Sequence, residues 1–102
     1  MVRTWSARAT EAGAEDYRNY FSTTLLPELK ALAGFRGALL LTRPAGELVE
    51  LTAHTMWESL AAIKAFAGGD VTAAKVEPEA QAMLRESDER VVHRTAVLAE
   101  LP

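Results

Sequence analysis

The chain contains no cysteine, which excludes disulfides, iron–sulfur clusters and thiolate zinc sites. It also has no run of lysine or arginine, and its formal net charge is −3, from 11 basic and 14 acidic residues. Phosphate backbones require a concentrated positive charge, so nucleic acid is not an expected partner. No apolar run approaches the roughly 18 residues of a membrane span, and residues 1–30 lack the apolar core of a targeting signal. These absences predict a soluble, cytoplasmic protein that does not enter a membrane.

What is present suits a single globular domain over residues 1–102. Hydrophobic residues make up 49% of the chain and charged residues 25%, which is ordinary for a folded protein and too apolar for a disordered one. A domain of this size buries only part of its apolar surface. A partner surface would therefore help to stabilise it.

The first half of the chain predicts a strand, a long helix and a second strand. Val2–Thr10 alternates, with Arg3, Trp5, Ala7 and Ala9 on one face. Gly13 is expected to end this strand. A helix is expected from Ala14 to a stop at Gly34, with a buried stripe formed by Tyr17, Tyr20, Phe21, Thr24, Leu25, Leu29 and Leu32. Pro27 should kink or restart this helix, because it lacks a backbone donor.

The second half predicts a hairpin, further helices and a last strand. The hairpin joins Phe35–Arg43 to Glu47–Trp57 through a turn at Pro44–Gly46, and Val49, Leu51, Ala53, Thr55 and Trp57 form the better core face of its second arm. Ser59 can cap a helix that stops at Gly68. A short helical turn is possible over Asp70–Lys75, a helix is expected from Pro78 to about Glu86, and a strand over Arg90–Leu101.

This order predicts an α+β fold, a ferredoxin-like βαββαβ sandwich with an antiparallel sheet and helices on one face. The other face of the sheet would expose more apolar surface than a small monomer normally leaves in water. We therefore predict a homodimer in which two sheets pack face to face.

Five features carry a resemblance to a known family: Trp5 in the first strand, the tyrosine-rich first helix, Gly34–Gly37, Trp57–Phe66 and Arg90–Arg94. With these features, nearly the whole chain resembles the antibiotic biosynthesis monooxygenase type of dimeric α+β-barrel protein. The resemblance implies a homodimer and cofactor-independent oxygenation of a phenol, quinol or polyketide, with no cofactor and no metal. It does not by itself specify a reaction, because the superfamily also includes haem-degrading enzymes and members without an assigned activity.

Three positions depart from the patterns of these relatives. The position of the haem-ligating histidine in haem-degrading members is Val76 here, so haem degradation is not expected. The asparagine and tyrosine of cofactor-free polyketide monooxygenases are matched by Ala53 and Ile63. Their specific substrate contacts are therefore not carried over.

The candidate substrate-binding residues are aromatic: Trp57, Tyr17, Tyr20 and Phe66. Trp57 could form a pocket wall that stacks on a flat ligand and donates its indole N–H, or it could be a core residue that covers the corner between sheet and helix. Tyr17 and Tyr20 could bind a phenolic ligand through their hydroxyls, or they could be core residues with a polar tip.

The candidate catalytic residues are His93 and Arg94. His93 titrates near neutrality and could act as a base, or it could be a satisfied surface or interface histidine. Arg94 could stabilise an anionic intermediate, or it could pair with Glu50 across strands. His54 is expected on the face opposite Trp57, in a structural role, and two histidines without a carboxylate at ligand spacing predict no metal site.

Two functions follow as alternatives. One is a cofactor-independent monooxygenase that acts on a small aromatic substrate. The other is a non-enzymatic homodimer of the same fold that binds a small molecule or has a structural role.

Overall fold

A computed structural model describes all residues 1–102 as an α+β domain with an antiparallel sheet. The elements are β1 (Val2–Ala9), α1 (Glu11–Tyr20), the π-helical turn η1 (Phe21–Leu25), α2 (Leu26–Lys30), β2 (Phe35–Ala45), β3 (Leu48–Trp57), α3 (Leu60–Ala67), α4 (Pro78–Gln81), β4 (Glu86–Ser87) and β5 (Val92–Arg94). The strands lie in the order β2-β3-β1-β4, and β5 also pairs with β1. This arrangement is compatible with the predicted ferredoxin-like fold.

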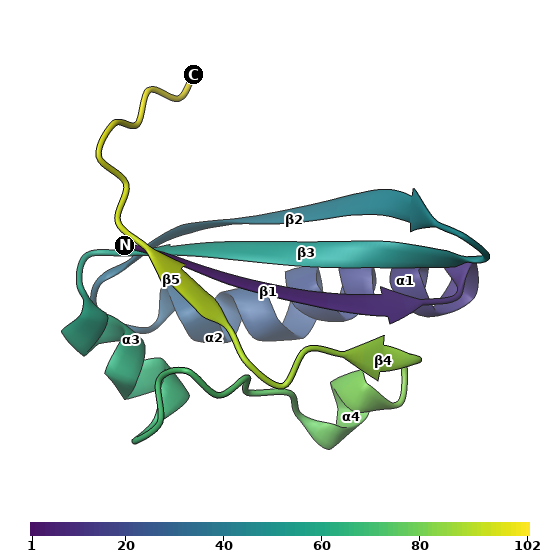
Figure 1. Cartoon of the computed structure of the whole chain (residues 1–102). Helices are drawn as coiled ribbons and strands as arrows, with labels where there is room; N and C mark the ends of the chain where they lie inside the picture. Colours follow the sequence, from purple (N-terminus) through teal and green to yellow (C-terminus); the bar gives the residue numbers. More distant parts are fainter.

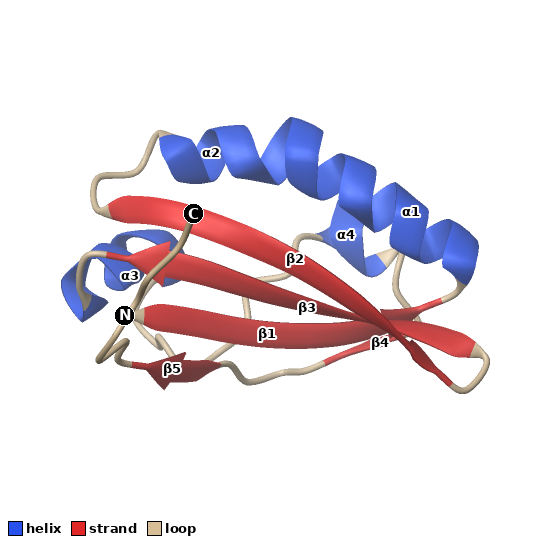
Figure 2. Ribbon diagram, turned by 90° about the horizontal axis from the view of Figure 1, so that it is seen from above, coloured by secondary structure: helices blue, strands red, loops and turns tan.

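All helices lie on one side of the sheet (Figures 1 and 2). We call this side the covered face and the other side the open face. On β3 the alternation follows the prediction, because Leu51, Ala53, Thr55 and Trp57 are buried on the covered face. The partly exposed residues between them point to the open face. No helix is long and apolar enough to cross a membrane.

Helices α1 and α2 form one continuous helical segment that is interrupted by the π-helical turn η1. The turn ends at Leu25, and Pro27 is the second residue of α2 and has no backbone N–H to donate. The Leu26 N–H bonds instead to the carbonyl of Phe21, five residues earlier. Pro27 therefore restarts the helix, as predicted, and Tyr17, Tyr20 and Phe21 are buried against the sheet.

The helix begins earlier than predicted, and Gly13 lies inside it. Thr10 is the N-cap, and its hydroxyl accepts a hydrogen bond from the Gly13 N–H at 3.1 Å. A Cβ at residue 13 would collide with the carbonyl oxygen of Met83. Glycine at this position thus allows a close approach between two segments and does not end the strand.

The hairpin and α3 form largely as predicted. Strand β2 extends to Ala45, past the predicted end, and Pro44 pairs with Val49, so the turn lies at Gly46 and Glu47. Ser59 caps α3 by accepting the Ala62 N–H at 3.2 Å. Gly68 ends the helix with a φ of 85°, a conformation that favours glycine.

The last third of the chain differs from the prediction. Residues 70–75 form a turn and an isolated bridge between Ala73 and Arg90 instead of a helix, and α4 has only 4 residues. The Arg90 side chain bonds to Asp70 at 3.0 Å, and Arg3 of β1 donates to the carbonyls of Val71 and Ala73.

The predicted strand Arg90–Leu101 is also wrong, because β5 contains only 3 residues. Strands β4 and β5 pair with opposite ends of the same edge of β1, and the segment between them leaves that edge. Residues 95–102 have no partner strand. They project from the sheet on the side of the open face (Figure 1).

Candidate functional site: an aromatic cavity under the sheet

A cavity of about 70 Å³ lies between the covered face of the sheet, the α1–α2 segment and the chain from Phe66 to Ala80. Most of its lining is apolar. The lining residues are Arg3, Trp5, Tyr17, Tyr20, Phe21, Leu25, Glu28, Leu29, Ala53, Thr55, Phe66, Lys75, Val76, Glu77, Ala80 and Val91. Such an enclosed apolar space with a few polar groups is the usual form of a small-molecule site.

Aromatic rings form one wall of the cavity. The ring centroids of Trp5 and Tyr17 are 5.8 Å apart, Tyr17 lies 5.8 Å from Tyr20, and Tyr17 lies 6.2 Å from Phe21. The helical spacing of the last three residues places them on the side of α1 and η1 that faces β1 and β3. The structure thus brings the predicted Tyr17 and Tyr20 together at the cavity, and it adds Trp5 from the first strand.

Neither tyrosine hydroxyl forms a hydrogen bond within the protein, although both residues are more than nine-tenths buried. No side-chain nitrogen or oxygen is sealed from solvent without a partner, so these hydroxyls are accessible at the cavity or its mouth. Burial and the neighbouring Tyr20 raise the pKa of Tyr17. Burial raises the pKa of Tyr20, and the charges of Glu28, Glu77 and Glu79 raise it further. Both hydroxyls are therefore protonated at neutral pH and can donate to a ligand.

Arg3 is the one buried charged residue, and its side chain lines the cavity. Its Nη1 donates to the Val71 carbonyl at 2.6 Å and lies 3.1 Å from His93 Nε2, and its Nη2 donates to the Ala73 carbonyl at 2.9 Å. The guanidinium carbon also lies 5.8 Å from the centre of the Phe66 ring. Burial lowers the pKa of Arg3, but an arginine with such a high ordinary pKa remains charged.

Sequence reasoning missed Arg3 as a site residue. One signal was available, because Arg3 shares a strand face with Ala7 and Ala9, which are fully buried. A charged residue on a core face is unusual and points to a function or to a partner.

Trp57 does not line the cavity. It is 2% exposed, and its indole N–H donates to the Thr55 hydroxyl at 2.9 Å, so this N–H is not free for a ligand. Its ring stacks on Phe66 with centroids 5.7 Å apart and meets the edge of Phe35 at 5.3 Å. Trp57 is therefore a core residue at the corner between sheet and helix and not a pocket wall. Its neighbours Phe66 and Thr55 line the cavity.

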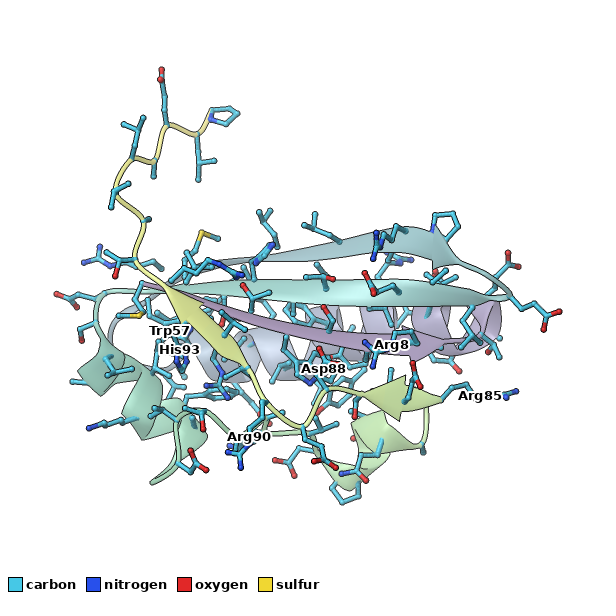
Figure 3. The ribbon with its side chains drawn as sticks, viewed as in Figure 1. Arg8, Trp57, Arg85, Asp88, Arg90 and His93 are labelled. Atoms are coloured by element: carbon cyan, nitrogen blue, oxygen red, sulfur yellow. The ribbon has the colours of Figure 1, made fainter.

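The predicted catalytic residues His93 and Arg94 lie on opposite faces of the sheet. His93 pairs with Arg3 across strands β5 and β1 on the covered side, where Figure 3 also shows Trp57. Its Nε2 accepts from Arg3, and it does not itself line the cavity. Burial and the charge of Arg3 lower the pKa of His93, so the ring is neutral at pH 7.

Arg94 is exposed on the open face, where it pairs with Val2. It does not bind Glu50, whose carboxylate accepts from Arg43 at 2.7 Å. His54 lies on the open face as predicted, and its Nδ1 is 2.9 Å from the Thr4 hydroxyl. The structure therefore does not bring His93 and Arg94 to one site.

Charged side chains of both signs lie around the cavity. Lys75 is 4.9 Å from the Phe66 ring centre, and the guanidinium carbon of Arg3 is 5.8 Å from it. Glu28 and Glu77 line the cavity, and their charges raise the pKa of Tyr20. Positive side chains thus lie at Phe66, and carboxylates lie near Tyr20.

The three positions that depart from the family patterns have different surroundings. Val76 and Ala53 line the cavity, whereas Ile63 is fully buried beside Leu29 and Trp57.

No group of three or more histidine, aspartate or glutamate side chains is placed to hold a metal ion. No family model matches the chain, and no curated protein matches it.

Proposed function

We propose that this protein binds a small aromatic compound in the cavity and oxygenates it without a cofactor, as a monooxygenase of phenol, quinol or polyketide type. The observation that carries the proposal is the aromatic wall at Trp5, Tyr17 and Tyr20, which includes two tyrosine hydroxyls without a partner in the protein. Flat rings pack well against such a wall, and the hydroxyls can bind a ligand oxygen.

The chemistry would depend on the substrate itself. An electron-rich phenol that loses its proton can transfer electrons to dioxygen, and a carbon–oxygen bond forms at the ring. Loss of water then gives the quinone: the substrate loses its O–H and one C–H hydrogen, one oxygen atom becomes the new carbonyl, and the other leaves in water. The protein supplies orientation, exclusion of bulk water and stabilisation of the anion.

Oxygen consumption with a panel of small quinols and phenols tests this proposal. The variant Val76→Phe narrows the cavity from a loop, and Val97→Phe places the same change in the tail, where Val97 is 94% exposed. We expect wild type and Val97→Phe to consume oxygen and form quinone in equal amounts, and Val76→Phe to lose most of this activity. Absence of turnover in the wild type, or equal turnover in all three proteins, would refute the oxygenase.

A second function is favoured by the position of the predicted base. His93 binds Arg3 and does not line the cavity, and Arg94 lies on the open face. An aromatic cavity without a free base suits a non-enzymatic binding protein. In that case the same compounds would bind, Val76→Phe would weaken binding, and no oxygen would be consumed.

We also propose that the chain forms the predicted homodimer through the open face, so that a βαββαβ unit completes an α+β barrel with its copy. The open face exposes Leu39, Leu41 and Val92 at 48%, 45% and 49%. The tail on the same side exposes Val97, Leu98 and Leu101, and this apolar segment would contact the apolar face of a second copy. A cytoplasmic location remains a prediction.

Light scattering tests the homodimer. The double variant Leu39→Glu/Leu41→Glu would place two charges in the proposed interface, whereas Thr23→Glu places a charge on the exposed side of η1. We expect a dimer for the wild type and Thr23→Glu, and a monomer for the double variant. A monomeric wild type at micromolar concentration would contradict the proposal.

A further inference from the structure

We propose that Arg3 anchors a negatively charged oxygen of the ligand, so that the cavity selects aromatic anions over neutral compounds of the same shape. This inference rests on the proposed aromatic ligand and adds its charge and its orientation.

The hydrogen bonds of Arg3 leave two of its N–H donors without a partner in the protein. A guanidinium has five N–H donors. Nη1 donates to Val71 and His93, and Nη2 donates once, to Ala73. The Nε–H and one Nη2–H therefore have no partner. No side-chain nitrogen is sealed from solvent without a hydrogen-bond partner, so the Nε atom is accessible, and Arg3 lines the cavity.

An Nε–H and the adjacent Nη2–H form the edge of a guanidinium that can bind a carboxylate with two parallel hydrogen bonds. The same edge does so elsewhere in this protein, where Arg18 donates from Nε and Nη2 to the two oxygens of Glu15 at 3.2 and 2.6 Å. A ligand carboxylate would fit both donors of Arg3, and a phenolate oxygen would accept from one or both.

Arg3 also lacks a counterion. The other arginines either pair with a carboxylate within 4.0 Å or are exposed, as Arg85 and Arg94 are. Arg3 alone is buried, at 5% exposure, with only carbonyl oxygens and a neutral histidine as partners. A buried charge without a counterion is costly, and an anionic ligand would offset that cost.

The charges around the cavity favour contact between such a ligand and Arg3. Lys75 adds a second positive charge at the Phe66 ring, and the carboxylates of Glu28 and Glu77 repel an anion near Tyr20. The anionic group therefore lies at Arg3, and the ring lies against Trp5 and Tyr17. His93 is a positioning residue, because it accepts from Nη1 and leaves the Nε–H of Arg3 without a partner in the protein.

Two probes of equal shape test the inference without any mutation. Benzoate and benzamide have nearly the same size, but only benzoate carries a charge. Binding can be followed by calorimetry and by the fluorescence of Trp5. We expect benzoate to bind about ten- to one-hundredfold more tightly than benzamide, the range expected for a hydrogen-bonded charge. Titration with 4-nitrophenol below and above its own pKa shows whether a phenolate is selected in the same way.

Variants then assign the selectivity to a residue. Arg3→Gln should abolish the preference for benzoate, Arg3→Lys should keep only part of it because the two-pronged edge is lost, and Lys75→Gln should reduce it less. Circular dichroism confirms that each variant is folded. If Arg3→Gln does not fold, the wild-type ratio and the Arg3→Lys ratio still decide the outcome.

Equal binding of benzoate and benzamide to the wild type would overturn the inference, as would a preference that survives in Arg3→Gln or no binding of either probe. These outcomes differ from failure of the proposed oxygenase. If the protein selects anions through Arg3 but consumes no oxygen, the role of Arg3 stands and the oxygenase is refuted. If it consumes oxygen but binds neutral and anionic probes equally, the oxygenase stands and the role of Arg3 is refuted.

Discussion

The two faces of the sheet are built from the same strands and hold their polar residues in different ways. On the open face, Thr4 contacts His54 and Ser6 contacts Thr52, both at 2.9 Å, and water can replace either partner. On the covered face, Thr55 accepts the indole N–H of Trp57 in a fully buried contact. Polar groups can therefore be changed cheaply on the open face, whereas each change on the covered face leaves a buried group without a partner.

Each side of the sheet also has groups that do not fit its general character, and these groups indicate what the side binds. The covered side contains polar groups that the protein itself does not satisfy: two N–H donors of Arg3 on β1, and the hydroxyls of Tyr17 and Tyr20 on α1. The open face exposes large apolar side chains, Leu39 and Leu41. Unsatisfied donors in a cavity favour a ligand, and exposed leucines on a flat sheet favour a protein partner.

The largest expected difference between the faces is in the loss of folding stability when a leucine of the hairpin is replaced with alanine. Leu51 is fully buried on the covered face, and Leu41 is 45% exposed on the open face. Replacing Leu51 with alanine leaves a cavity in the core, so we expect Leu51→Ala to lower the free energy of unfolding by about 2–5 kcal/mol. Leu41→Ala should cost less than about 1 kcal/mol, measured by urea unfolding of the dilute protein.

Repeating these measurements at several protein concentrations tests whether the open face is a dimer interface. If the open face is a dimer interface, the cost of Leu41→Ala should rise with protein concentration, because dimerisation stabilises the folded chain by mass action. The cost of Leu51→Ala should not depend on it in this way. If Leu51→Ala and Leu41→Ala lower the unfolding free energy of the dilute protein by similar amounts, the covered face is not the more tightly packed one.

A smaller difference is expected from two threonines of β3. Thr55→Val removes the acceptor of the buried Trp57 N–H and should cost about 1–3 kcal/mol in unfolding free energy. Thr52→Val removes a contact with Ser6, whose hydroxyl can bind water instead, and should cost less than about 0.5 kcal/mol. Urea unfolding monitored by tryptophan fluorescence measures the stability of both variants. Equal losses of unfolding free energy would contradict a contact between Thr55 and Trp57 that excludes water.

The smallest expected effect is a pH dependence from His93. Burial and the charge of Arg3 lower its pKa below the ordinary 6.5, so the folded state disfavours its protonation. Its contribution to stability is therefore present above pH 6.5 and is lost as the pH falls through the lowered pKa.

The variant His93→Gln provides the control, because glutamine does not titrate but can still accept from Arg3. The wild type should lose stability relative to His93→Gln as the pH falls below 6.5. Parallel stability curves for the two proteins would show that His93 does not contribute. His54→Gln on the open face separates the two histidines, since it should leave the His93 contribution in place.

Local sequence patterns correctly predicted most of the regular elements. The alternation of β3, the stripe of Tyr17 and Tyr20, the Ser59 cap and the Gly68 stop all depend on residues close together in the chain. The last third could not be predicted in this way, because Asp70, Ala73 and Arg90 are held together by contacts across about 20 residues. The backbone of residues 89–91 pairs with residues 72–74, so only the three residues of β5 remain paired with β1 in this part of the expected strand.

The sequence by itself determined the α+β order of the elements, the core face of β3 and the aromatic side of the first helix. These follow from hydrophobic periodicity, which acts within each element. The alternation of residues along a strand also puts His93 and Arg94 on opposite faces. Only the tertiary structure decided which polar groups meet. It paired His93 with Arg3, placed Trp57 behind Phe66, and brought Arg3 without a counterion to the cavity. Such meetings depend on distances between elements, which no local pattern records.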